Sequence, residues 1–218
     1  PERSSRRVLT TELVDAMRFE EFIATAPQSA KDLAGDVIFD ACFRSLFCHG
    51  AYNGDPHPGN YLFLPGGRVA FLDFGCVQRY HPETVEGLRQ VRRTLMGGAG
   101  PKAVRERTIE ALGLPPDLDR EELAYLDDYT ECVYEPVAKD QAFRFDRAYT
   151  ERLADLSLQG GFLIARKALR KGIREAKRPG FLFLNRIQYG LTSVLAALEA
   201  EANWHQMMRK IDEEGASA

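Results

Sequence analysis

The sequence predicts an α+β domain that is predominantly helical and contains a single β-hairpin. Six segments after residue 82 show the apolar spacing of helices and are separated by glycine- and proline-rich stops. Two short apolar runs flank Pro65-Gly66-Gly67, a pattern typical of a hairpin turn. With 218 residues, of which 44% are apolar, the chain is long enough to bury a hydrophobic core.

The expected elements follow in chain order. Residues 8–13 are β-prone. A helix over residues 29–49 begins near a capping-type Ser-Ala-Lys-Asp sequence and ends at Gly50. The hairpin pairs residues 61–64 with residues 69–72. The remaining helices are expected at residues 82–96, 101–112, 120–133, 146–158, 162–176 and 185–211.

Composition excludes several classes of protein. The 29 basic and 32 acidic side chains give a formal net charge of −3, which argues against a generally cationic nucleic-acid binder. Four cysteines without short paired spacing indicate a reducing compartment rather than a disulfide or zinc framework. No apolar run approaches the ~18 to 20 residues of a membrane span. We therefore expect a cytoplasmic protein that is at most peripheral to a membrane.

A polar, turn-rich segment over residues 53–60 precedes the hairpin and is a candidate site. If Tyr61 pairs with Leu72, the antiparallel register places Asn60 directly opposite Asp73. A carboxylate and an amide oxygen would then face one point. Hard cations prefer such oxygen ligands, so this pair predicts a site for Mg²⁺ or Mn²⁺.

Asp55 lies five residues before Asn60 and could accept a proton from an attacking hydroxyl. The pattern D-x-x-x-x-N followed by Asp73-Phe74-Gly75 has the order of the protein-kinase catalytic and metal-binding loops. The alternative is an Asx turn at Asp55 and a surface hairpin that ends in a solvated aspartate. Cys76, which follows directly, is expected to pack as a small apolar side chain.

Four motifs of the sequence are distinctive: G-D-P-H-P-G-N-Y-L at residues 54–62, F-L-D-F-G-C at 71–76, R-V-L-T-T-E at 7–12 and F-L-F-L-N-R at 181–186. Together they resemble the UbiB/AarF family of atypical protein-kinase-like proteins. That resemblance implies a kinase-like C-terminal lobe (C-lobe) with an ATP and Mg²⁺ site. It also implies an ATPase or phosphotransferase activity, linked in several members to ubiquinone and isoprenoid-lipid metabolism.

The resemblance also assigns roles to individual residues. Asp55 would be the catalytic aspartate, and Asn60 and Asp73 would be the metal ligands. His57, inside the same loop, would either contact phosphate or only brace the loop. The hinge whose backbone meets adenine would be formed by Glu12, Leu13 and Val14.

Two features depart from the family pattern. The family usually has His-Ala where this chain has Asn53-Gly54, so the support that the histidine gives the loop is in question. The nucleotide-covering loop, the strand lysine and the K-x-G-Q segment of the N-terminal lobe (N-lobe) do not occur in these residues. We therefore expect residues 1–14 to be the last N-lobe strand and the hinge, and residues 15–218 to be the C-lobe. The N-lobe would be a missing partner in cis, and the isolated chain would be inactive.

Two other functions remain open. A small-molecule phosphotransferase of the aminoglycoside- or choline-kinase type shares the G-D-x-H-x-x-N loop, and a non-catalytic pseudokinase scaffold needs no lysine-bearing N-lobe. The basic residues between Arg166 and Arg178 fall on one side of a helix. They form either a solvated face or a surface that attracts anionic lipid, whereas the lack of interleaved aromatic residues argues against nucleic acid.

Overall fold

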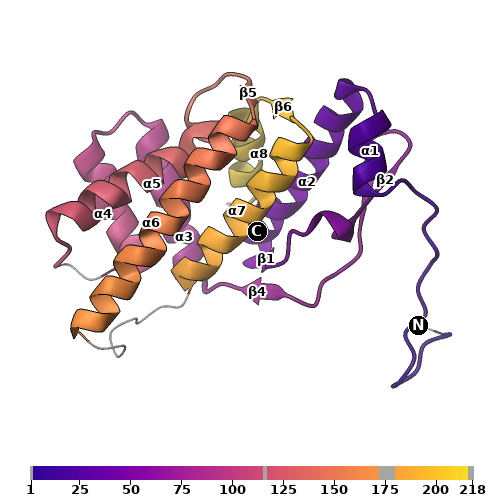
Figure 1. Ribbon diagram of the computed structural model, residues 1–218, viewed down its shortest axis with the longest axis horizontal. Coiled ribbons are helices and arrows are strands. Elements are labelled where there is room, and N and C mark those ends of the chain that lie inside the picture. The colour runs from indigo at the N-terminus through magenta and orange to yellow at the C-terminus, as the bar shows by residue number, and fades with distance from the viewer. Residues whose placement is uncertain (1, 115–116, 172–179, 216–218) are drawn as a thin grey trace.

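The computed structural model describes residues 2–114, 117–171 and 180–215. This part of the chain is mostly helical, with short strands between the helices (Figure 1), so the predicted α+β, predominantly helical class is confirmed. Within it, no helix combines the length and the apolar composition that a bilayer span requires. The helices are α1 (Phe19–Thr25), α2 (Gln28–His49), α3 (Pro82–Met96), α4 (Pro101–Leu112), α5 (Arg120–Ala138), α6 (Arg147–Lys171), α7 (Gly180–Ala197) and α8 (Trp204–Gly215).

The strands of the described residues form three antiparallel pairs. The pair β1–β4 brings residue 53 opposite residue 77 and thereby closes off the span of chain that holds the candidate site. The pairs are β1 (Ala51–Asn53) with β4 (Val77–Arg79), β2 (Tyr61–Leu64) with β3 (Arg68–Phe71), and β5 (Phe143–Arg144) with β6 (Glu201–Ala202).

The core forms where α2 packs against α8 and the segment before it. Trp204 is fully buried, with its ring 4.7 Å from that of Phe39, and its Nε1 donates to the Phe143 carbonyl at 2.7 Å. A Cβ on Gly35 of α2 would lie 2.5 Å from Cβ of Ala200, so only glycine allows this approach. Helix α2 is thus held firmly along its length, and β1 follows directly from its C-terminal end.

The hairpin forms where it was predicted, but its register differs by one residue. Tyr61 pairs with Phe71, and the Leu72 amide donates to the Asn60 carbonyl at 3.0 Å. Asn60 therefore lies opposite Leu72, and the predicted pairing of Asn60 with Asp73 is wrong. The reason is the turn, which has three residues between the paired strands instead of four: Pro65, Gly66 (φ 78°) and Gly67 (φ 75°).

Helix boundaries agree with the sequence where caps mark them. Helices α3 and α4 have the predicted bounds, and Gly50 ends α2 in the left-handed conformation, with φ 59°. Helix α2 begins one residue earlier than predicted, after Pro27. Helix α5 continues beyond residue 133 to Ala138 with Pro136 in its last turn.

Two predicted interruptions differ in the structure. Residues 146–158 and 162–176 were expected to be separate helices, but α6 runs through Gly160-Gly161 without a break up to residue 171, and residues 172–176 lie outside the described residues. A Cβ on Gly160 would lie 2.0 Å from the Tyr125 hydroxyl, so this glycine allows close packing and does not stop the helix. The single helix expected over 185–211 is instead divided between α7 and α8, with Glu199 at φ 50° between them.

Residues 9–16 have no regular secondary structure, so the β-prone run at 8–13 does not form a strand here. A strand needs a hydrogen-bonded neighbour. In the described chain, this region has only the isolated bridges Ser5–Val8 and Met17–Phe63. The division into an N-lobe strand with hinge (1–14) and a C-lobe (15–218) stays a prediction.

Candidate functional site

The predicted catalytic residues lie on two neighbouring loops, which we call the Asp55 loop (residues 53–60) and the Asp73 loop (residues 72–76). The first follows β1 and leads into β2, and the second connects β3 to β4. Because β1 pairs with β4 and β2 pairs with β3, both loops are fixed at both ends. The topology therefore brings residues 20 positions apart in sequence next to each other.

In the Asp55 loop, the Asn60 amide Nδ2 donates to the Asp55 carbonyl oxygen at 3.0 Å and to its carboxylate Oδ2 at 3.4 Å. The structure thus brings together Asp55 and Asn60, as their spacing predicted. The Asn60 Oδ1 atom accepts no hydrogen bond from a described residue. This amide oxygen is therefore free to bind a cation.

His57 stabilises the turn between these two residues. Its ring Nδ1 accepts a hydrogen bond from the Gly59 amide at 3.0 Å and caps a short 3₁₀ helix, η1 (Pro58–Asn60). The imidazole is otherwise exposed. The hydrogen bond with Gly59 stabilises the loop, whereas a contact between His57 and phosphate stays a prediction.

The Asp73 loop turns sharply and presents its carboxylate to solvent. Oδ1 of Asp73 accepts from the Gly75 amide at 2.7 Å, and Oδ2 has no hydrogen bond from a described residue. Phe74 is 64% exposed and Cys76 is exposed as well. The expectation that Cys76 packs as a small apolar side chain is therefore wrong, because β4 lies at the surface and offers it no core.

Asn53 joins the two loops, a role that the sequence did not predict. Its Nδ2 donates to the Asp73 carbonyl at 2.9 Å, and its Oδ1 accepts from the Asp55 amide at 3.3 Å. The Gly54 amide donates to the Cys76 carbonyl at 2.9 Å, and a Cβ on Gly54 would lie 2.7 Å from that oxygen. The Asn-Gly pair that departs from the family's His-Ala is thus the pair that holds the loops together, and alanine would not fit at position 54.

A second contact that the sequence did not indicate comes from α7. A Cβ on Gly190 would lie 2.4 Å from Cγ of Pro56, so the proline ring of the Asp55 loop packs directly on the helix backbone. Proximity to a helix about 130 residues away cannot be recognised from local spacing. The only sequence signal was a glycine inside an apolar helix, which often marks such an approach.

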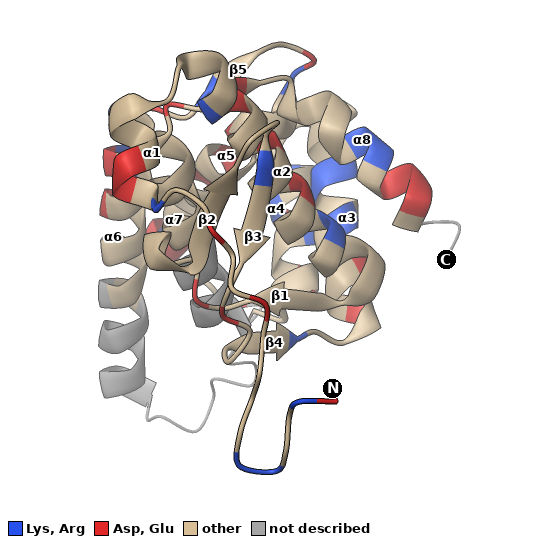
Figure 2. Ribbon diagram, turned by 90° about the vertical axis from the view of Figure 1, so that its right-hand side faces the viewer, with Lys and Arg blue, Asp and Glu red and all other residues tan. Residues whose placement is uncertain are grey.

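Both site carboxylates lack a basic partner among the described side chains. No lysine or arginine of the described chain forms an ion pair with Asp55 or Asp73. Figure 2 shows acidic segments in the loops beside β1 and β4, a basic segment at the end of β4, and both basic and acidic segments on α8. Burial raises the pKa of Tyr61, and the nearby charges, including that of Asp55, raise it further. The site is therefore negative and suited to a cation.

The donor set fits a cation that takes most of its ligands from elsewhere. The described residues contain no group of three His, Cys, Asp or Glu side chains close enough to hold a metal ion. Asn60 and Asp73 offer one amide and one carboxylate oxygen. Mg²⁺ characteristically binds to few protein ligands and keeps water or phosphate oxygens.

The predicted hinge is not joined to these loops by any hydrogen bond of the described chain. Glu12 and Leu13 are exposed, Leu13 to 93%, and Val14 is half-buried. The segment is anchored only further on, where Met17 exchanges backbone hydrogen bonds of 3.0 and 2.9 Å with Phe63. The basic residues from Arg166 to Arg178 lie outside the residues whose side chains are described.

Comparison with known proteins gives a family for the segment that carries the site. Residues 1–98 match the ABC1 atypical kinase-like domain. ACTIVITY OF BC1 COMPLEX KINASE 3, a chloroplastic protein of Arabidopsis thaliana, is 43% identical over 76 residues, which are 34% of this chain and 10% of that protein. An uncharacterized chloroplastic aarF domain-containing protein kinase of the same plant is 33% identical over 90 residues, 41% of this chain and 12% of its own.

A solved structure extends the similarity to nearly the whole chain. The complex of Rv3197 with erythromycin, from Mycobacterium tuberculosis, superposes with a TM-score of 0.64 over 94% of this chain and 49% of that one, at 21% identity. The fold is thus kinase-like, as predicted. The chain spans a quarter or less of the first curated relatives that it matches.

Proposed function

We propose that this chain supplies the catalytic and metal-binding loops of an ATP- and Mg²⁺-dependent kinase or ATPase. Residues 1–98 match the ABC1 atypical kinase-like domain, and this match confirms the UbiB/AarF resemblance. The observation that carries the proposal is the junction of the two loops. Asn60 contacts Asp55, and Asn53 contacts both Asp55 and Asp73. A solvated surface hairpin would not require these cross-loop contacts.

Each residue has a chemical task in this proposal. Asp55 accepts the proton of the attacking hydroxyl or orients it, and the Asn60 amide fixes the direction of its carboxylate. Asn60 Oδ1 and Asp73 hold the cation, which, when bound, neutralises charge on the phosphates. The predicted hinge at Glu12, Leu13 and Val14 would meet adenine once the N-lobe is present, and His57 would contact phosphate.

Two variants of the full-length protein, with its N-lobe, test this assignment. Asp73→Asn should remove Mg²⁺-dependent nucleotide binding, because it takes away the charged ligand. Asp55→Asn should retain that binding and lower turnover by ~10²- to 10⁴-fold, the range expected for loss of a general base. Calorimetry with Mg·ATP and a phosphate-release assay measure the two effects.

Asp128→Asn is the matched control, since Asp128 is an exposed aspartate on α5 outside the Asp55 and Asp73 loops. It should change neither quantity. If Asp55→Asn and Asp73→Asn both hydrolyse ATP at the unchanged rate, the site is misassigned.

The biological context is proposed at the same level. Family membership favours a role in ubiquinone or isoprenoid-lipid metabolism, with the Arg166 to Arg178 segment attracting anionic lipid at a membrane surface. The N-lobe would cover the exposed apolar side chains near the predicted hinge, such as Val8 and Leu13. Phe71, by contrast, is half-buried against Tyr61, 5.5 Å between ring centroids.

A second candidate is a protein that binds or phosphorylates a small molecule. Its support is a groove of about 1000 Å³ along α4, α5 and α6, which is large enough for a macrolide such as the erythromycin named with Rv3197. Titration of the chain with erythromycin tests this. Saturable binding that Asp155→Asn or Glu131→Gln in the groove weakens would favour it, and no heat of binding would dismiss it.

A further inference from the structure

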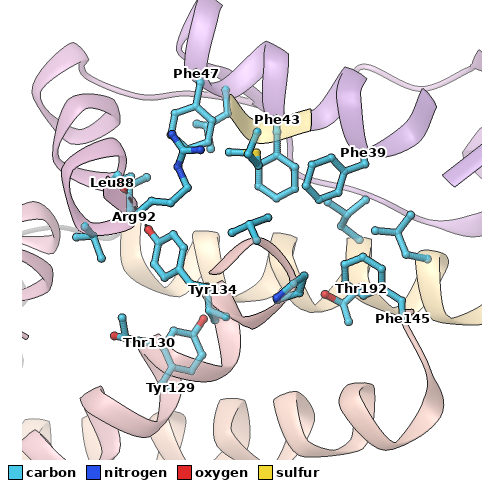
Figure 3. Close-up of a pocket in the computed structure, with 18 of the residues that line it drawn as sticks. Phe39, Phe43, Phe47, Leu88, Arg92, Tyr129, Thr130, Tyr134, Phe145 and Thr192 are labelled. Carbon is cyan, nitrogen blue, oxygen red and sulfur yellow. Dashed lines mark hydrogen bonds between the residues drawn. The ribbon is translucent and has the colours of Figure 1, made fainter. Parts of the chain in front are cut away.

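An apolar cavity of about 100 Å³ lies in the helical core, away from the two loops. Side chains of α2, α3, α5 and α7 line most of it (Figure 3). Arg92 lies between Phe47 and Tyr134 at one end, and Phe39, Phe145 and Thr192 lie at the other (Figure 3). The cavity is therefore polar at one end and apolar along the rest.

Arg92 is the charged residue of this lining, which contains no aspartate, glutamate or lysine. Its side chain is 0% exposed, and its Nε and Nη1 atoms have no hydrogen-bond acceptor in the described chain. Nη2 forms an ion pair with Asp212 of α8. A buried guanidinium has five N–H donors, so most of its donors lack an acceptor.

The local charge balance is positive. Asp212 is shared among three arginines of α3, because Arg89 approaches it at 3.4 Å and Arg93 at 3.9 Å. Glu86 adds one more carboxylate through its 2.5 Å contact with Arg89. Three positive charges thus face two negative ones.

The neighbouring hydroxyl groups do not supply the missing acceptors. Tyr134 donates to the Leu88 carbonyl at 3.2 Å, and Thr108 donates to the Val104 carbonyl at 2.9 Å. Burial raises the pKa of Tyr134 to about 12, so this phenol stays neutral at physiological pH. Burial lowers the pKa of Arg92 to about 10, which still leaves the guanidinium charged.

We propose that this cavity binds a small carboxylate with a short aliphatic tail, its carboxylate on Arg92 and its tail against Phe43 and Leu88, which line the cavity next to Arg92. A carboxylate matches the guanidinium fork and balances the excess charge. Size limits the tail, because a cavity of roughly 150 Å³ accommodates benzene and this one is smaller. An acid of about two or three carbons, which has fewer heavy atoms than benzene, fits.

A pair of fluorinated probes tests the proposal on the 218-residue chain by ¹⁹F NMR titration. Fluoroacetate and 2-fluoroethanol share one tail and differ in the head group. The acid should bind saturably and at least tenfold more tightly than the alcohol. Arg92→Met should reduce this preference to less than threefold and leave the affinity for the alcohol unchanged.

Two further variants keep the outcome interpretable. Arg93→Met removes an equal charge beside Asp212 but does not line the cavity, so it should preserve the preference for the acid. Leu88→Phe fills the space beside Arg92 and should abolish binding of both probes. Three outcomes would each overturn the proposal. The acid and the alcohol bind equally well, Arg92→Met and Arg93→Met lose the preference for the acid equally, or neither probe binds saturably, as for a cavity that holds only water.

Discussion

Asn53 uses both ends of its amide to hold the two site loops together. Asn53→Ala should therefore displace Asp55 relative to Asp73. We expect turnover of the full-length protein to fall about tenfold or more, with a loss of about 1 kcal/mol in the free energy of unfolding, typical of removed hydrogen bonds. Steady-state kinetics and chemical denaturation measure the two quantities.

Asn203→Ala is the matched control, because Asn203 also uses both ends of its amide, to Asp140 and to the Gln206 amide, but at the start of α8. It should lower stability by a similar amount and leave turnover unchanged. If the two variants affect turnover equally, Asn53 has only a structural role.

The cysteines differ in reactivity because burial differs. Burial raises the pKa of Cys42 to about 12 and also raises that of Cys132, whereas Cys76 is exposed. At pH 8, which lies well below the raised pKa of Cys42, that side chain is almost entirely the unreactive thiol. Iodoacetamide should therefore alkylate Cys76 first, as peptide mass spectrometry would show. Alkylation of Cys42 or Cys132 at the rate of Cys76 in the folded protein would contradict this assignment.

At the scale of elements, the contact between α7 and the Asp55 loop predicts different results for two helical glycines. Gly190→Ala places a methyl group against Pro56 and should destabilise the protein by about 1–3 kcal/mol, with reduced turnover in the full-length protein. Gly161→Ala in α6 meets nothing within 4 Å and should stabilise by up to about 1 kcal/mol. Thermal unfolding of both variants measures the difference. If Gly190→Ala is more stable than the unchanged protein, the Asp55 loop moves away from the added methyl group without loss of stability, and the prediction is wrong.

The elements also show how far local signals reach. Caps and punctuation predicted α3, α4 and the end of α2, because these boundaries depend on neighbouring residues. The spacing of Asp55 and Asn60 placed them in one loop, where they are in contact, whereas the catalytic and metal-binding roles of Asp55, Asn60 and Asp73 stay predictions. The continuity of α6 through Gly160 was not recognisable from the sequence, because it depends on packing against Tyr125 from another helix. The predicted hairpin register was wrong because the length of the turn sets the register, and the sequence allowed a turn of either three or four residues.

At the scale of the whole molecule, the net charge of −3 opposes binding to anionic membranes. Any such binding must come from a local patch, for which the Arg166 to Arg178 segment is the candidate. Vesicles that contain phosphatidylserine should bind the protein in a salt-sensitive manner, and neutral phosphatidylcholine vesicles should not. Reversal of four charges, at Arg166, Lys167, Arg170 and Lys171, should abolish cosedimentation. Equal binding to both kinds of vesicle would exclude an electrostatic membrane surface.

Three backbone hydrogen bonds span the base of the site: Tyr80 N to the Gly50 carbonyl, Gly54 N to the Cys76 carbonyl and Leu72 N to the Asn60 carbonyl. Two of these bonds join the Asp55 loop to the Asp73 loop, and the third extends the β1–β4 pair, so we expect the two loops to open together. Their amides should exchange with solvent as a single cooperative unit. The spacing between Asp55 and Asp73 is then an all-or-none property: the intact unit holds both carboxylates in place, and one opening event displaces both.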